Sequence, residues 1–154
     1  MGSTYEGACR ASSGQSDRDI GEAHTIMAAG IARQAARLFY LAQFHAAQAL
    51  IFERTGKTSK THKGVRTQFH LLAKTEVSLD QGLTGNLTAA FQFKEAVDYE
   101  LGYLADIAPA DAAAAMTAAE HFIAEVKRVR AASPVRSLSP TTHLTCHSPP
   151  SRVE

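Results

Sequence analysis

The chain lacks most of the features that mark an exported, membrane-spanning or highly charged protein. Its 154 residues contain only two cysteines, Cys9 and Cys146 near opposite ends, so no disulfide framework is expected. The formal net charge of +1 restricts any nucleic-acid binding to a local cluster of charge. The first residues lack the apolar core of a signal peptide. Together these features predict a reduced, cytoplasmic protein.

Long apolar runs are also missing, with one exception at residues 38–52, where no side chain carries a permanent charge. A helix of this length rises only about 22 Å, against about 30 Å for the hydrocarbon core of a membrane, so we expect no membrane span. Two stripes follow the run at helical spacing: Leu38, Ala42, His45, Ala49 and Phe52 on one, and Tyr40, Phe44, Ala47 and Ile51 on the other. A helix that is apolar on more than one side belongs at the centre of a bundle.

Apolar periodicity, charges at helix ends and glycine or proline breakers predict four more helices around this one. The predicted helices cover residues 17–29, 32–56, 64–75, 83–103 and 109–132. No strand pattern and no internal repeat is present in the sequence. The fold class is therefore predicted as all-α, an antiparallel bundle of about five helices.

Both ends of the chain differ in composition from this helical part. Residues 1–16 are small and polar without a period, and we expect a disordered tail there. Residues 133–154 contain four of the five prolines and no apolar pattern, which predicts a second disordered tail rich in serine, proline and threonine. One helical domain at 17–132 remains.

A cluster of basic residues without any acid follows the central helix, next to a predicted helix start near Gly64. Its members are Arg54, Lys57, Lys60, His62, Lys63 and Arg66. Positive charge and the free backbone amides of a helix start can together hold phosphates. Lys60, His62, Lys63 and Arg66 are therefore candidate residues for binding nucleotide or RNA. A solvated loop whose lysines have no specific partner would have the same composition.

A second candidate site lies on the predicted fourth helix. Lys94 and Asp98 are four residues apart, as are Glu95 and Tyr99, so each pair shares a helix face. An ammonium group near a phosphodiester would stabilise developing negative charge, and a phenol could relay a proton. The alternative is an intrahelical ion pair of about 0.3–0.5 kcal/mol beside an amphipathic tyrosine.

Neither a metal nor a cofactor is expected. His45 is alone on its apolar stripe, with no second ligand one helical turn away, so a hydrogen-bonded core histidine is the favoured interpretation. His143, Cys146 and His147 are an isolated group in the predicted tail, which is weak support for a metal site. The sequence contains no glycine-rich phosphate loop and no serine nucleophile motif.

Three motifs resemble those of the HEPN domain family, especially its small stand-alone bacterial members. They are Phe44-His45-Ala46-Ala47 on the central helix, the turn Lys60-Thr61-His62-Lys63-Gly64, and Lys94 followed by Val97-Asp98-Tyr99. Their order agrees with the five predicted helices. The resemblance covers residues 19–132 and leaves out both tails.

The resemblance implies a bundle that forms a homodimer, with relatives that are ribonuclease toxins or defence nucleases, often paired with a small nucleotidyltransferase antitoxin. In catalytic relatives an arginine holds the phosphate and a histidine a few residues later moves the ribose 2′-hydroxyl proton, without a metal. Here Lys94 stands at the arginine position and Tyr99 at the histidine position. Lysine lacks the bidentate fork, and a phenol pKa of about 10 suits a base poorly. His62 would be the alternative base if the basic turn folded over the fourth helix.

These observations leave three hypotheses about function. The first is a HEPN protein with a degenerate catalytic motif that binds nucleotide, RNA or a nucleotidyltransferase partner and is related to toxin–antitoxin or defence systems. The second is a weak, metal-independent ribonuclease toxin whose catalytic residues are Lys94, Tyr99 and Asp98. The third is a helical dimer with a purely scaffolding role.

Overall fold

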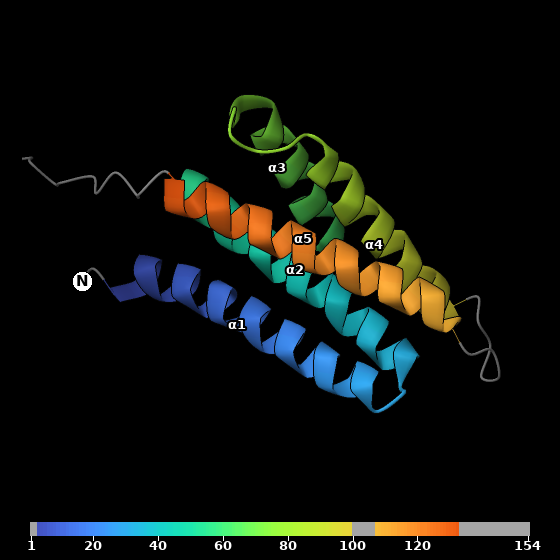
Figure 1. Ribbon diagram of the computed structural model, residues 1–154. Coiled ribbons are helices and arrows are strands. Elements are labelled where there is room, and N and C mark those ends of the chain that lie inside the picture. Colours follow the sequence, from blue (N-terminus) through green and yellow to red (C-terminus); the bar gives the residue numbers. More distant parts are fainter. Residues whose placement is uncertain (1–2, 100–106, 133–154) are drawn as a thin grey trace, which may run out of the picture.

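Five α-helices make up the structure, a computed structural model that describes residues 3–99 and 107–132 (Figure 1). They are α1 (Ser3–Ala28), α2 (Ala32–Thr55), α3 (His62–Thr75), α4 (Gly82–Tyr99) and α5 (Pro109–Ala132). No strand occurs within these two ranges. The predicted all-α fold class is confirmed.

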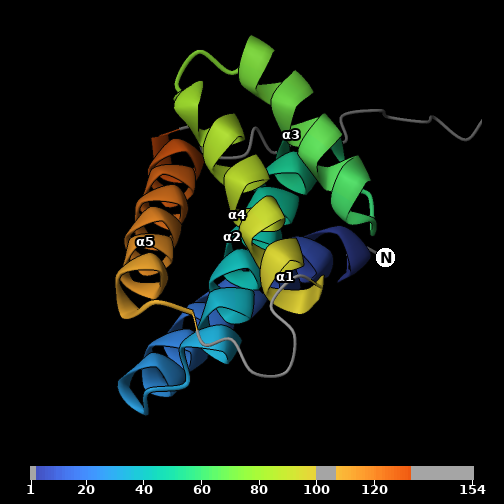
Figure 2. The same cartoon turned by 90° about the vertical axis from the view of Figure 1, so that its right-hand side faces the viewer.

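The helix at the centre is α2, which packs against all four of the others (Figures 1 and 2). Twelve of its 24 residues are buried, including Phe39, Tyr40 and Leu50. This placement follows from its two apolar stripes, because a helix that is apolar on several sides needs several neighbours to exclude water. The predicted central role of α2 is confirmed.

The connection from α2 to α3 is tight and fixes where α3 begins. Gly56 ends α2 with a positive φ of 73°, and its N–H donates to the carbonyl of Phe52. Thr61 caps α3 by accepting a hydrogen bond from the N–H of Gly64 at 3.0 Å. A Cβ on Gly64 would lie 2.1 Å from Oγ of Ser59, so only glycine allows the turn to pack this closely against the helix. The start of α3, with His62, is thereby held over α2 and α4.

The predicted tail at residues 1–16 is wrong from Ser3 onward, because α1 begins there and continues without a break to Ala28. Ser16 is buried and donates to the carbonyl of Ala42 at 2.8 Å, and Asp19 contacts His45 at 2.6 Å. In the first part of this helix the contacts with α2 are made by small and polar residues such as Ser16, so that part carries no apolar period from which a helix could be predicted.

The other predicted helices agree closely with the structure. Helix α5 has the predicted bounds, and α3 begins two residues before the predicted Gly64. The predicted end of α4 near residue 103 and the predicted tail at 133–154 lie outside the described residues.

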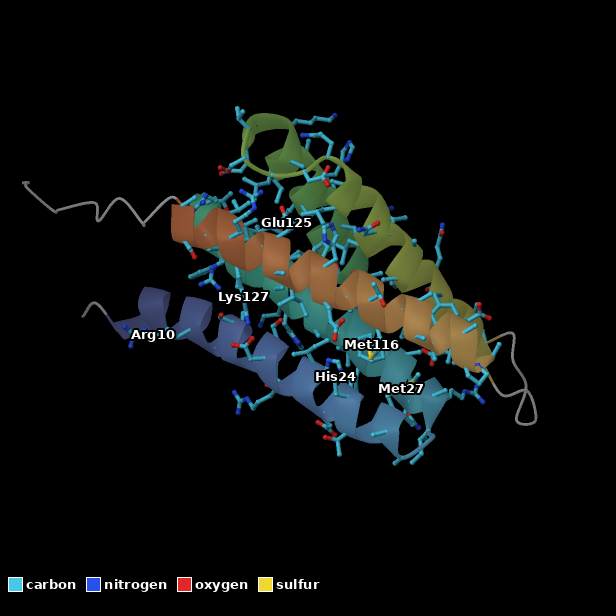
Figure 3. All side chains as sticks on the ribbon, viewed as in Figure 1. Arg10, His24, Met27, Met116, Glu125 and Lys127 are labelled. Atoms are coloured by element: carbon cyan, nitrogen blue, oxygen red, sulfur yellow. The ribbon has the colours of Figure 1, made fainter. Side chains whose placement is uncertain are left out.

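The core is formed mainly where α2 meets α3, α4 and α5, with Phe69 and Phe122 packing at a ring distance of 5.3 Å. A smaller cluster lies around Phe39, and Met27 of α1 and Met116 of α5 both pack against it (Figure 3). None of the described helices combines the length and the hydropathy that crossing a membrane requires.

Replacing Leu50 with alanine should lower the free energy of unfolding by about 2–5 kcal/mol, because its side chain is fully buried in the core and its removal leaves a cavity. Urea unfolding followed by circular dichroism measures the change. The matched control is Leu71→Ala, since Leu71 is 57% exposed on α3 and the same truncation there should change stability by less than about 0.5 kcal/mol. Equal losses in the two variants would contradict the observed packing of α2.

Candidate functional site

A groove of about 490 Å³ lies where α1, α2, the start of α3 and the end of α4 meet. Its charged lining comes from Arg37 of α2, Lys94 and Asp98 of α4, and Glu22 of α1, and His62 of α3 also faces it. The remaining lining residues are Ile26, Gln34, Leu38 and Leu41. Polar groups from four helices thus converge on an otherwise apolar floor, as in many binding sites.

An ion triplet forms one wall of this groove. Asp98 accepts a hydrogen bond from Nε of Arg37 at 2.5 Å and another from Nζ of Lys94 at 2.8 Å. Burial alone would raise the pKa of the Asp98 carboxyl, but the hydrogen bonds and charges of Lys94 and Arg37 outweigh it and hold that pKa below its usual value. Asp98 therefore stays ionised and fixes both cations in position.

His62 is the first residue of α3 and contacts the core beneath the groove. Its Nδ1 lies 2.7 Å from the hydroxyl of Tyr40, and its ring packs against those of Phe44 and Phe91. Burial lowers the pKa of His62, and the positive charges of Lys94 and Arg66 lower it further against the opposing effect of Glu95. The imidazole is therefore neutral at pH 7.

The Tyr40 hydroxyl determines which nitrogen of His62 carries the hydrogen. Burial raises the pKa of Tyr40, against the opposing charge of Arg66, so the phenol keeps its proton. A buried hydroxyl needs an acceptor, and Nδ1 of His62 is the acceptor within reach among the described residues. We therefore assign the tautomer in which Tyr40 donates to Nδ1 and Nε2 carries the hydrogen. In this state His62 acts as a donor.

Arg66 lies one helical turn after His62 and extends the positive charge beside the groove. Its guanidinium carbon lies 3.9 Å from the centre of the Phe91 ring, a cation–π contact. Its Nε is buried and makes no hydrogen bond within the described part of the chain.

The structure brings together only some of the residues that the sequence singled out. Lys94, Asp98 and His62 line one groove, and Arg66 lies beside it. His62 and Arg66 therefore lie against α4 through Phe91. Lys60 and Lys63 are exposed and do not line the groove.

Tyr99 is separated from the groove. Five residues turn a helix by about 500°, which places Tyr99 about 140° around α4 from Lys94. Its side chain is 80% exposed and is absent from the groove lining. Lys94 and Tyr99 therefore do not face a common reaction centre within one chain.

Three residues on which the site depends were missed from the sequence, Arg37, Tyr40 and Glu22. Arg37 reaches Asp98 across 61 residues of chain, and Tyr40 reaches His62 across 22. The only sequence signal was that Arg37 is a charged residue directly before the long uncharged run of α2.

The lone histidine of α2 is satisfied as predicted, since His45 contacts Asp19 at 2.6 Å. Within the ranges that the structure describes, no group of three or more His, Cys, Asp or Glu side chains is arranged to hold a metal. His143, Cys146 and His147 lie outside those ranges.

These observations define the class of protein as a five-helix all-α bundle with a groove between its central helix and three neighbours. The model of one protein family, the HEPN domain, matches residues 10–129. The chain belongs to the HEPN family. The match starts within α1, before the predicted domain start at residue 17. A search of curated proteins finds no match. Membership supports a function connected with nucleotides or RNA, and HEPN domains often dimerise.

The pKa of His62 should lie below the ordinary histidine value of about 6.5 and rise in Lys94→Gln, because that change removes a positive charge facing the ring. Two-dimensional NMR of the imidazole signals during a pH titration measures both values. In Lys74→Gln the pKa should be unchanged, since Lys74 lies about 18 Å away along α3. A His62 pKa that is equal in all three proteins would show that Lys94 does not act on the ring.

The lowered pKa of His62 also determines in which direction the free energy of unfolding changes with pH. A histidine whose folded pKa is lowered binds fewer protons in the folded than in the unfolded chain between the two pKa values. The contribution of His62 to the free energy of unfolding is therefore fully present above about pH 6.5 and is lost as the pH falls through that window.

Proposed function

We propose that the protein binds the phosphate of an RNA or a nucleotide in this groove, as a HEPN domain with little or no catalytic activity. The observation that carries the proposal is the convergence of Arg37, Lys94 and His62 from three helices on one groove. Each of them presents hydrogen-bond donors, and the fixed cations need no reorganisation to meet an anion.

The donors left over by the internal contacts support this proposal. Arg37 has five N–H donors, of which Nε is used by Asp98 and one terminal nitrogen by Gln34 at 3.4 Å. Lys94 has three, one of them directed at Asp98. Nε2 of His62 adds a neutral donor. These groups suit the several acceptor oxygens of a phosphate.

The charge balance predicts a modest affinity. The two cations of the lining are matched by the two carboxylates Asp98 and Glu22, and at His62 the positive charge of Arg66 beside the groove is opposed by Glu95. Asp98 is already paired with both cations, whereas Glu22 is exposed on the wall formed by α1. Glu22 is therefore the group that should repel an incoming phosphate without holding any cation in place.

Lys94→Gln should weaken the binding of a fluorescently labelled single-stranded RNA about threefold to tenfold, because one phosphate contact is lost. For the same reason the slope of the logarithm of affinity against the logarithm of salt concentration should become shallower by about one. Glu22→Gln should tighten binding, because it removes the opposing charge. Fluorescence anisotropy at several salt concentrations measures both effects, and competition with a mononucleotide shows whether one phosphate group is enough.

The matched control is Lys74→Gln, which removes the same charge from an exposed position on α3 outside the groove. Lys60→Gln together with Lys63→Gln tests the exposed part of the basic turn. Affinity that falls in the Lys60 and Lys63 variant but not in Lys94→Gln would move the binding surface to the turn and contradict the groove.

A metal-independent ribonuclease is the second candidate, favoured by the neutral His62 next to Lys94. Neutral imidazole is the form that can accept a proton, and an ammonium group beside it can stabilise a phosphorane. Accepting a proton at Nε2 would require the opposite tautomer and would leave the Tyr40 hydroxyl to accept from Nδ1. That cost, and the position of Tyr99 away from the groove, make binding the better supported proposal.

Mixed RNA incubated with the protein and a chelator should stay intact if the site only binds. Cleavage that is lost in His62→Gln and in Lys94→Gln but kept in Tyr99→Phe would support the ribonuclease instead and assign the base to His62. Loss in Tyr99→Phe would restore the predicted role of Tyr99. Cleavage that is equal in all variants would come from a site other than the groove. Gel electrophoresis of the RNA reads out each case.

Homodimer formation, a nucleotidyltransferase partner and a link to toxin–antitoxin systems remain predictions supported by the resemblance to HEPN relatives. Sedimentation velocity over a range of protein concentrations tests the first. A neighbouring gene for a small nucleotidyltransferase would support the other two.

A further inference from the structure

A second pocket, of about 290 Å³, lies between α2, α4 and α5 and shares no charged residue with the groove. Figure 2 shows α4 and α5 beside one another with α2 behind them. Buried residues of α2 line the pocket, among them Phe39 and Tyr40, and Phe93 of α4 is a third aromatic residue of the lining. Alanines of α4 and α5 form most of the rim, and their short side chains leave the space open.

One polar group lies at the floor of this apolar pocket, the side-chain amide of Gln43. The residue is 1% exposed, and its Oε1 accepts no hydrogen bond from any described residue. Its Nε2 lies 3.4 Å from the carbonyl of Phe39 one turn earlier. The opposite orientation of the amide would place two oxygens against each other, so the oxygen is the atom left without a partner.

We propose that this pocket binds a small, flat, uncharged aromatic molecule that carries one N–H or O–H donor. Three aromatic residues in a mostly apolar lining favour a ring, and the volume suits one or two fused rings. The donor is required because a buried acceptor without a hydrogen bond costs free energy, which a donor on the ligand recovers. Asn86 and Asp111 at the rim allow a further polar substituent at the open end. Nothing in this proposal depends on the groove or on phosphate binding.

Indole and benzofuran form a matched pair of probes, because they have nearly the same shape and only indole carries an N–H. In a titration of the full-length ¹⁵N-labelled protein, indole should shift the backbone amide signals of Gln43, Ala90 and Ala114 in a saturable way. Benzofuran should bind about threefold to tenfold more weakly, since it leaves Oε1 of Gln43 without a partner. The fitted dissociation constants measure this ratio.

Gln43→Met keeps the length of the side chain and removes the acceptor, so both probes should bind this variant with equal affinity. Ala114→Leu fills the exposed rim and should weaken both probes, whereas Ala124→Leu makes the same change at an exposed position of α5 outside the pocket and should weaken neither. The rim variants keep the test decisive if Gln43→Met does not fold.

Equal binding of indole and benzofuran to the wild type, or a preference for indole that persists in Gln43→Met, would overturn the proposed role of Gln43. Shifts confined to residues outside the pocket, or no saturable shift, would overturn the site. Shifts of the pocket amides on dilution of the protein alone would also overturn it, because they would mean that a second copy of the chain covers this face.

Discussion

The burial of α2 on several sides is the constraint on which the rest of the structure depends. A buried polar side chain on such a helix cannot turn to solvent, and with the exception of Gln43 those described above find a partner on another helix. Tyr40 finds His62 of α3, His45 finds Asp19 of α1, and Arg37, at the edge of the buried part, finds Asp98 of α4. These contacts hold three neighbouring helices in register around α2, and all three contribute residues to the lining of the groove. The candidate site is therefore a consequence of how the core satisfies its polar groups.

Within the groove, two opposing effects decide the state of Asp98. Its side chain is 10% exposed, and removing an ionised carboxylate from water is costly. Two charge-assisted hydrogen bonds at 2.5 and 2.8 Å oppose this cost, and each of them exceeds a neutral hydrogen bond in strength by about twofold. The lowered pKa of Asp98 indicates that the hydrogen bonds win. An ionised Asp98 cannot give a proton to a leaving group at neutral pH, so its role in the groove is to position cations.

Much of the fold could be predicted from the sequence, because α2 and α5 carry long apolar periods and α5 begins at Pro109 followed by Asp111, two residues that favour a helix start. The first part of α1 could not, since small and polar residues such as Ser16 fill its contacts. The candidate site, too, was predictable from the sequence only in part. The Lys94 and Asp98 pair is local to one helix and was predictable from spacing. The contacts of Arg37 and Tyr40 arise from tertiary packing between distant segments, so the spacing of residues along the sequence could not predict them.

Tyr40 links the core to the chemistry of the groove. Its ring is 1% exposed and packs against Phe44, Phe91 and His62, so the hydroxyl cannot rotate toward water to lose or exchange its partner. Because burial also keeps the phenol protonated, the hydrogen that it gives to Nδ1 leaves the other nitrogen of His62 as a donor. Arg37 and Lys94 also carry N–H donors beyond those that Asp98 accepts. All three groups that converge on the groove then offer hydrogens, and an anion with several acceptor oxygens matches this pattern better than a reaction that must begin with the removal of a proton.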